Sequence, residues 1–80
     1  MVVYTIIEQV FDPYATVSIL NEFACKTFYG AQRIMRAKAD IYSYRDGMSV
    51  VEESGQSIIL GRPDGSGVYL QIRKAALLND

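Results

Sequence analysis

The sequence predicts an α+β domain in which an antiparallel sheet of four to five strands carries one helix on one face. Short runs of β-branched and aromatic residues recur along the chain, and they are separated by turn signals such as Asp-Pro, Ser-Gly and Asp-Gly. A single stretch has strong helical periodicity. The expected order of elements is therefore β-β-α-β-β-β. A chain of 80 residues is one domain with a thin core, so we treat residues 1–80 as a unit.

The first two elements precede the helix. Residues 2–11, VVYTIIEQVF, favour a strand because most are β-branched or aromatic. Residues 16–25, TVSILNEFAC, fit a strand or a helix. The preceding Asp12 and Pro13 are typical of a helix start, whereas the β-branched content favours a strand. We take the strand, with a bulge near Asn21, and the helical alternative for residues 13–25 stays open at this point.

The helix begins after Thr27, a good capping residue, and is expected to run from Phe28 to about Ala39. One side of it is apolar, formed by Phe28, Ala31, Ile34, Met35 and Ala39. Lys38 lies beside that side and is expected to extend towards solvent. The opposite side is aromatic and mostly positive, formed by Tyr29, Arg33, Arg36 and Asp40. Arg36 and Asp40 are four residues apart, which is the spacing of a helical ion pair.

The rest of the chain predicts a meander. Residues 41–44, IYSY, are expected to be a short extended piece, followed by strands at 48–53, 57–62 and 68–74 that are joined by glycine-containing turns. The tail at 75–80 fits a helical turn or a frayed end. Several of these strands have adjacent apolar residues, so one face of the sheet either stays open and partly apolar or is covered by the tail or a loop.

Composition excludes several classes of protein. The net charge is −1, so the chain lacks the positive excess of a non-specific duplex DNA binder. The single cysteine, Cys25, excludes an internal disulfide and fits a reducing compartment, and the apolar runs are too short to span a membrane. The first ten residues do not resemble a signal peptide because they lack a basic lead. We expect a cytoplasmic protein.

The sequence offers little for catalysis. It has no histidine, which removes the usual general base and the usual zinc ligand. Its carboxylates lack the spacing of a metal site, and Cys25 is more simply a small apolar residue. The glycine-rich stretch at 61–67, GRPDGSG, joins two expected strands, and it is therefore a hairpin loop rather than a phosphate site. We expect no enzyme activity, no cofactor and no metal.

The positive charge of the chain is concentrated on its helix. Lys26, Arg33, Arg36 and Lys38 are four of the eight basic residues and all lie between residues 26 and 40. A charged outer stripe is by default a solvated face. With Tyr29 it could also contact nucleic acid, although so few phosphate contacts give only loose binding. It could equally bind a protein, because Arg and Tyr are enriched at the energetic centres of interfaces.

Three segments carry a family resemblance: YTIIEQV at 4–10, ACKTFYGAQRIM at 24–35, and SVVEESGQSIILGRPDGSGVYLQI at 49–72. In layout and local pattern the chain resembles small phage and mobile-element proteins that include anti-CRISPR inhibitors of type I systems. The resemblance implies a stoichiometric, non-catalytic inhibitor acting in the bacterial host cell. It would bind Cas proteins of the type I RNA-guided surveillance complex (Cascade), at the backbone or large subunit, and block or corrupt target DNA binding.

The resemblance also implies a site. In the family a basic pair at the helix start grips the backbone subunits, and Arg33 matches its second member, while Gln32 stands where the first is expected. We expect Tyr29, Arg33 and Arg36 to form the grip, with Gln32 at the rim and Lys26 as a long-range attraction. The alternatives are a small nucleic-acid-binding accessory or regulatory domain of a phage or mobile element, and a structural phage protein that forms a homodimer through the open sheet face.

Overall fold

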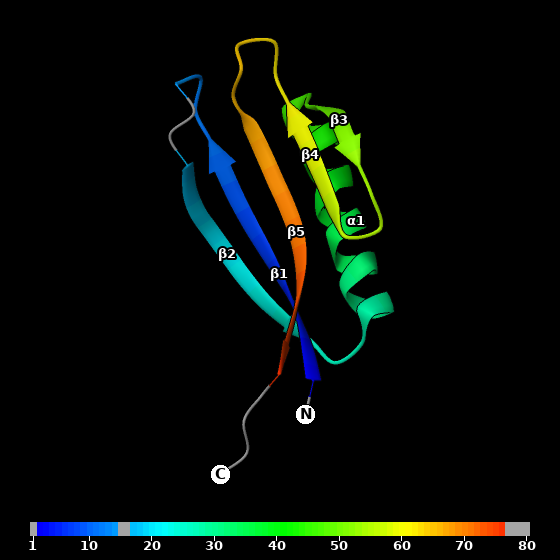
Figure 1. The fold of residues 1–80 in the computed structure, drawn as a ribbon. Helices are drawn as coiled ribbons and strands as arrows, with labels where there is room; N and C mark the ends of the chain where they lie inside the picture. Colours follow the sequence, from blue (N-terminus) through cyan, green and yellow to red (C-terminus); the bar gives the residue numbers. More distant parts are fainter. Residues whose placement is uncertain (1, 15–16, 77–80) are drawn as a thin grey trace.

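The computed structural model describes residues 2–14 and 17–76 and confirms the α+β fold. Its elements, in chain order, are β1 (Val2–Phe11), β2 (Val17–Cys25), α1 (Phe28–Asp46), β3 (Ser49–Glu53), β4 (Ser57–Gly61) and β5 (Gly67–Ala76). The strands form one antiparallel five-stranded sheet in the order β2-β1-β5-β4-β3, and α1 packs on one face of it (Figure 1). The long strands β1 and β5 are neighbours at its centre.

The core lies between α1 and the sheet, and strand register builds it. Directly opposite residues share a face of a sheet, so the pairing of Ile6 with Ile72 and of Val10 with Val68 puts these apolar side chains together under the helix. The helix contributes small or flexible side chains that fit against them. The buried apolar residues are Ile6, Ala31, Met35, Ala39, Met48, Ile58, Leu60, Val68, Leu70 and Ile72.

Helix α1 is longer than the sequence predicts. The IYSY stretch is not extended, because it continues the helix to Asp46. The inward stripe continues past the buried Ala39 to the half-buried Tyr42, so tertiary packing overrides the β-propensity of the aromatic residues. The helix ends at Gly47, whose φ of 67° is the left-handed conformation that glycine adopts without strain. Ile34, expected on the apolar side, is 39% exposed.

Residues 17–25 form a strand, so the structure decides between the strand and the helix that the sequence left open for this segment. Asn21 pairs with Glu8 but Ile19 pairs with Gln9, so residue 20 is an extra residue at a bulge, at the place that the sequence indicates. Before the strand, the Asp12 carboxylate accepts a hydrogen bond of 2.9 Å from the backbone N–H of Tyr14. This Asx turn follows the end of β1.

The glycine-rich stretch is a hairpin loop between β4 and β5, as expected. The backbone N–H and the hydroxyl of Ser66 donate to Asp64 Oδ1 at 2.9 and 2.6 Å, and Gly65 has a φ of 93°. Those hydrogen bonds hold the pKa of Asp64 below its ordinary value. Strand β5 continues to Ala76, beyond the predicted end at residue 74, and the tail at 77–80 lies outside the described residues.

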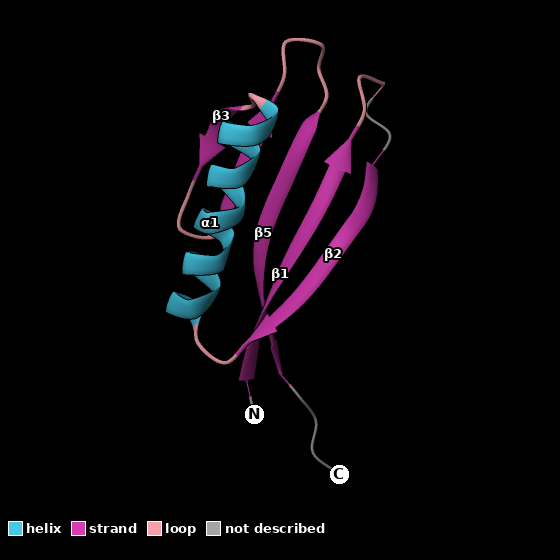
Figure 2. Cartoon of the chain, turned by 180° about the vertical axis from the view of Figure 1, so that it is seen from behind, coloured by secondary structure: helices cyan, strands magenta, loops and turns pink. Residues whose placement is uncertain are grey.

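Figure 2 shows the sheet from the side that α1 covers, and the opposite face, turned to the viewer in Figure 1, carries no helix among the described residues. On this open face the half-buried side chains of Ile7, Ile59 and Tyr69 alternate with those of Gln9 and Gln71. The mixture of apolar and polar side chains is typical of an antiparallel sheet with one solvated face.

Candidate protein-binding site on the helix face

The N-terminal half of α1 presents Tyr29 and Arg33 to solvent. Thr27 fixes this end of the helix, because its hydroxyl accepts a hydrogen bond of 3.0 Å from the backbone N–H of Gly30. Tyr29 is 69% exposed, and the Arg33 guanidinium carbon lies 6.0 Å from the centre of its ring. The two side chains are one turn apart, so the helix itself holds them as a cation–π pair.

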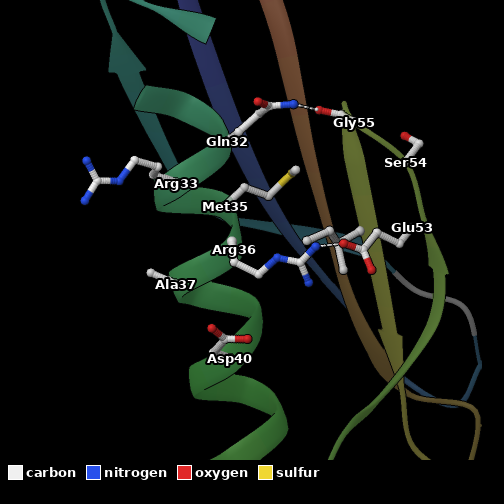
Figure 3. A pocket seen from close by; sticks show the side chains of 10 residues that line it. Gln32, Arg33, Met35, Arg36, Ala37, Asp40, Glu53, Ser54 and Gly55 are labelled. Atoms are coloured by element: carbon white, nitrogen blue, oxygen red, sulfur yellow. Dashed lines mark hydrogen bonds and ion pairs between the residues drawn. The ribbon is translucent and has the colours of Figure 1, made fainter. Parts of the chain in front are cut away.

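A groove runs between α1 and the hairpin of β3 and β4, and it has a volume of about 660 Å³ (Figure 3). Two of its contacts join the helix to the hairpin. The Gln32 side-chain amide donates to the Gly55 carbonyl at 2.9 Å, and the Arg36 guanidinium forms an ion pair with the Glu53 carboxylate. Figure 3 shows Arg33 pointing away from the hairpin. The groove floor includes the buried Met35 and Ile58.

The five residues proposed from sequence therefore lie in three different structural environments. Tyr29 and Arg33 form an exposed pair, whereas Gln32 and Arg36 are engaged with the neighbouring hairpin. The helical ion pair expected for Arg36 is replaced by its contact with Glu53. Lys26 is exposed in the connection between β2 and α1. The positive surface of the helix centres on Tyr29 and Arg33, because the charge of Arg36 is offset by Glu53.

A second charged cluster, which sequence reasoning missed, lies under the helix. The side chain of Glu8 is only 3% exposed, and Lys38 Nζ lies 3.4 Å from its Oε1. The hydroxyl of Tyr42 donates to Glu8 Oε2 at 2.5 Å. Lys38 Nζ also lies 4.4 Å from the centre of the Phe23 ring, so Lys38 points into the structure instead of extending to solvent. The cluster joins α1 to β1 and β2.

Burial and the carboxylate raise the pKa of Tyr42 to about 12. Desolvation is the larger cause, followed by the hydrogen bond to Glu8 and the repulsion between a phenolate and its charge. The sequence contained a signal for this cluster. Glu8 has the same parity along the strand as Ile6 and Val10, so a period of two already places it on the inward face.

The described residues offer no arrangement for metal binding. Within residues 2–14 and 17–76, no three side chains of the His, Cys, Asp or Glu type are grouped to hold a metal ion. Cys25 is half-buried at the end of β2 and packs against the core. Nor does any helix in the described part of the chain have the length and apolarity needed to cross a membrane.

Comparisons of the chain with protein-family models, with curated proteins and with solved structures find no match.

Proposed function

We propose that this chain is a non-catalytic inhibitor that binds another protein through the exposed face of α1. The observation that carries the proposal is the Tyr29–Arg33 pair, which is exposed, placed together by the one-turn spacing of the helix, and positive. A pre-ordered pair of this kind loses little side-chain entropy on binding. Arg and Tyr are also among the residues that contribute most to interface energies.

The resemblance of the three segments supplies the partner class. On that basis the partner is a type I RNA-guided surveillance complex (Cascade), and the effect of binding is to block or corrupt recognition of target DNA. The partner surface should be acidic around the Arg33 contact, because a guanidinium pairs best with a carboxylate. Lys26 adds a second positive charge before the helix and favours the approach of such a surface.

The experiment measures target DNA binding by a purified, RNA-loaded type I complex while this protein is titrated in. Wild type should abolish DNA binding at a stoichiometric ratio, and Arg33→Glu should need at least about tenfold more protein, because one central Arg contact is worth about 2 kcal/mol. The matched control is Arg73→Glu, which makes the same charge change at an exposed residue of β5 and should inhibit like wild type.

Three results would contradict the proposal. If wild type leaves DNA binding intact at every ratio and does not bind the complex, the partner class is wrong. If wild type shifts free DNA or RNA in a gel, and the shift falls steeply with salt, the chain is instead a nucleic-acid-binding accessory domain. Equal inhibition by Arg33→Glu and wild type would move the binding surface away from α1.

A further inference from the structure

The two edges of the sheet differ in how well they are protected. Strand β3 is five residues long, has a register shift next to Val51, and carries Glu52 and Glu53 at its end. Short length, bulges and charges are the means by which proteins keep edge strands from pairing with other chains. Strand β3 therefore has the properties of an edge that stays unpaired.

Strand β2 has few of these protections. It is nine residues long, and its sequence VSILNEFAC contains no proline and one charged residue, Glu22. Its bulge lies at residue 20, so residues 21–25 pair with β1 in regular register, and no other described strand pairs with β2. Figures 1 and 2 show its outer edge facing away from α1 along most of its length. The outer edge of residues 21–25 is thus a regular strand edge open to another chain.

The side chains along this edge are complementary to themselves. Phe23 lies on the helix side of the sheet, because it pairs with Ile6, and it is still 38% exposed. Glu22 and Ala24 face the open side and are exposed. In an antiparallel pair of two identical strands centred on Phe23 or Ala24, Glu22 of one copy lies diagonal to or directly opposite Lys26 of the other. The same pairing covers Phe23 with Phe23 or Cys25 of the second copy.

We infer that β2 is a homodimer edge, at which two copies of this chain pair antiparallel about Phe23 or Ala24 to form a continuous ten-stranded sheet. The pairing satisfies the open backbone groups of residues 21–25, buries the exposed Phe23 ring, and makes two Glu22–Lys26 contacts related by the two-fold axis. The inference does not depend on the proposed function. It differs from a dimer through the open sheet face, in which Ile7, Ile59 and Tyr69 would be covered.

The first test is the molar mass by light scattering over a range of protein concentrations. Wild type should change from monomer to dimer as the concentration rises. Ala24→Glu should raise the dissociation constant at least about tenfold, because the new carboxylate lies opposite its own copy when Ala24 is on the axis and opposite Glu22 of the other copy when Phe23 is. Two matched controls should dimerise like wild type: Ser49→Glu on the edge strand β3 and Gln71→Glu on the open face. Circular dichroism should show that all three variants keep the fold.

The second test is a charge exchange. Glu22→Lys and Lys26→Glu should each weaken the dimer several-fold because they place like charges together, and the double variant should restore it. The third uses cysteine in a Cys25→Ser background. Phe23→Cys or Ala24→Cys should form an intermolecular disulfide, whichever residue lies on the axis, and Ser49→Cys should not.

A chain that stays monomeric up to millimolar concentration would overturn the inference. A dimer that Ala24→Glu leaves unchanged and Gln71→Glu breaks would also overturn it, because that result assigns the contact to the open sheet face. If Glu22→Lys and Lys26→Glu each weaken the dimer but the double variant does not restore it, the antiparallel register about Phe23 or Ala24 is wrong.

Discussion

Two ion pairs join α1 to the sheet, and they differ in how much water surrounds them. Glu8–Lys38 has side chains 3% and 23% exposed, respectively, whereas Glu53–Arg36 has side chains 37% and 53% exposed. In both pairs the acid comes from a strand and the base from the helix. Screening makes an exposed pair worth little, while a buried acid that loses its partners is left charged in a poor solvent. The two pairs therefore have different roles despite the same chemistry.

This difference in exposure shows which positive charges of α1 are open to a partner. Lys38 belongs to the interior, where it compensates Glu8 and lies over Phe23. Arg36 lies at the surface, but Glu53 already offsets its charge. Arg33 points away from the hairpin and pairs with Tyr29. Among Arg33, Arg36 and Lys38, Arg33 is thus the one best placed to meet an acidic surface.

The largest effect is expected for Lys38→Met, which keeps the length of the side chain and removes the charge beside Glu8. The buried carboxylate then loses its counter-charge, and the free energy of unfolding should fall by about 2 kcal/mol, less than for a fully buried pair because Lys38 is partly exposed. Urea denaturation measures this loss. If Lys38→Met lowers the free energy of unfolding no more than Arg36→Met does, burial does not distinguish the two ion pairs.

A smaller loss is expected for Tyr42→Phe, which removes the hydroxyl that donates to Glu8 at 2.5 Å and keeps the ring. Because the acceptor is charged and buried, the free energy of unfolding should fall by about 1 kcal/mol. Tyr44→Phe is the matched control, since Tyr44 is 95% exposed on the same helix and should unfold like wild type. Equal stability of the two variants would show that the contact with Glu8 contributes nothing.

The same contact predicts a dependence of stability on alkaline pH. The pKa of Tyr42 is about 12 in the folded protein, above the ordinary tyrosine value of 10.0, so the folded state holds this proton more tightly than the unfolded state. Its contribution is complete below the unfolded pKa and is lost as the pH rises to the folded value. As the pH rises across that window, the denaturation midpoint should fall less steeply for Tyr42→Phe than for wild type. Parallel curves for the two proteins would contradict the contribution assigned to Tyr42.

The smallest effect is expected for the exposed pair. Arg36→Met or Glu53→Gln should lower the free energy of unfolding by about 0.5 kcal/mol at most, and added salt should reduce the difference further. Urea denaturation at low and high salt measures both quantities. A loss as large as that of Lys38→Met would show that the Arg36–Glu53 contact is a principal attachment of α1 to the β3–β4 hairpin.

Sequence periodicity was sufficient for the layout of the fold and insufficient for its contacts. The strand runs, the cap at Thr27 and the Asp64-Gly65 turn follow from local preferences, and the structure confirms them. The helical end of α1 depends on packing around Ala39 and Tyr42, which local propensity does not contain. The exposure of Tyr29 and Arg33 could be predicted from helical spacing. The pairing of Arg36 with Glu53 could not, because it depends on where the β3–β4 hairpin lies.

The role proposed for the Tyr29–Arg33 pair is to bind a partner protein at the surface of α1. The most direct test is the dissociation constant of the protein for a purified type I surveillance complex, measured by titration calorimetry for wild type, Arg33→Glu and Arg73→Glu. Arg33→Glu should weaken binding at least about tenfold, whereas Arg73→Glu should stay within about twofold of wild type. Equal dissociation constants for the two variants would contradict this role of Tyr29 and Arg33.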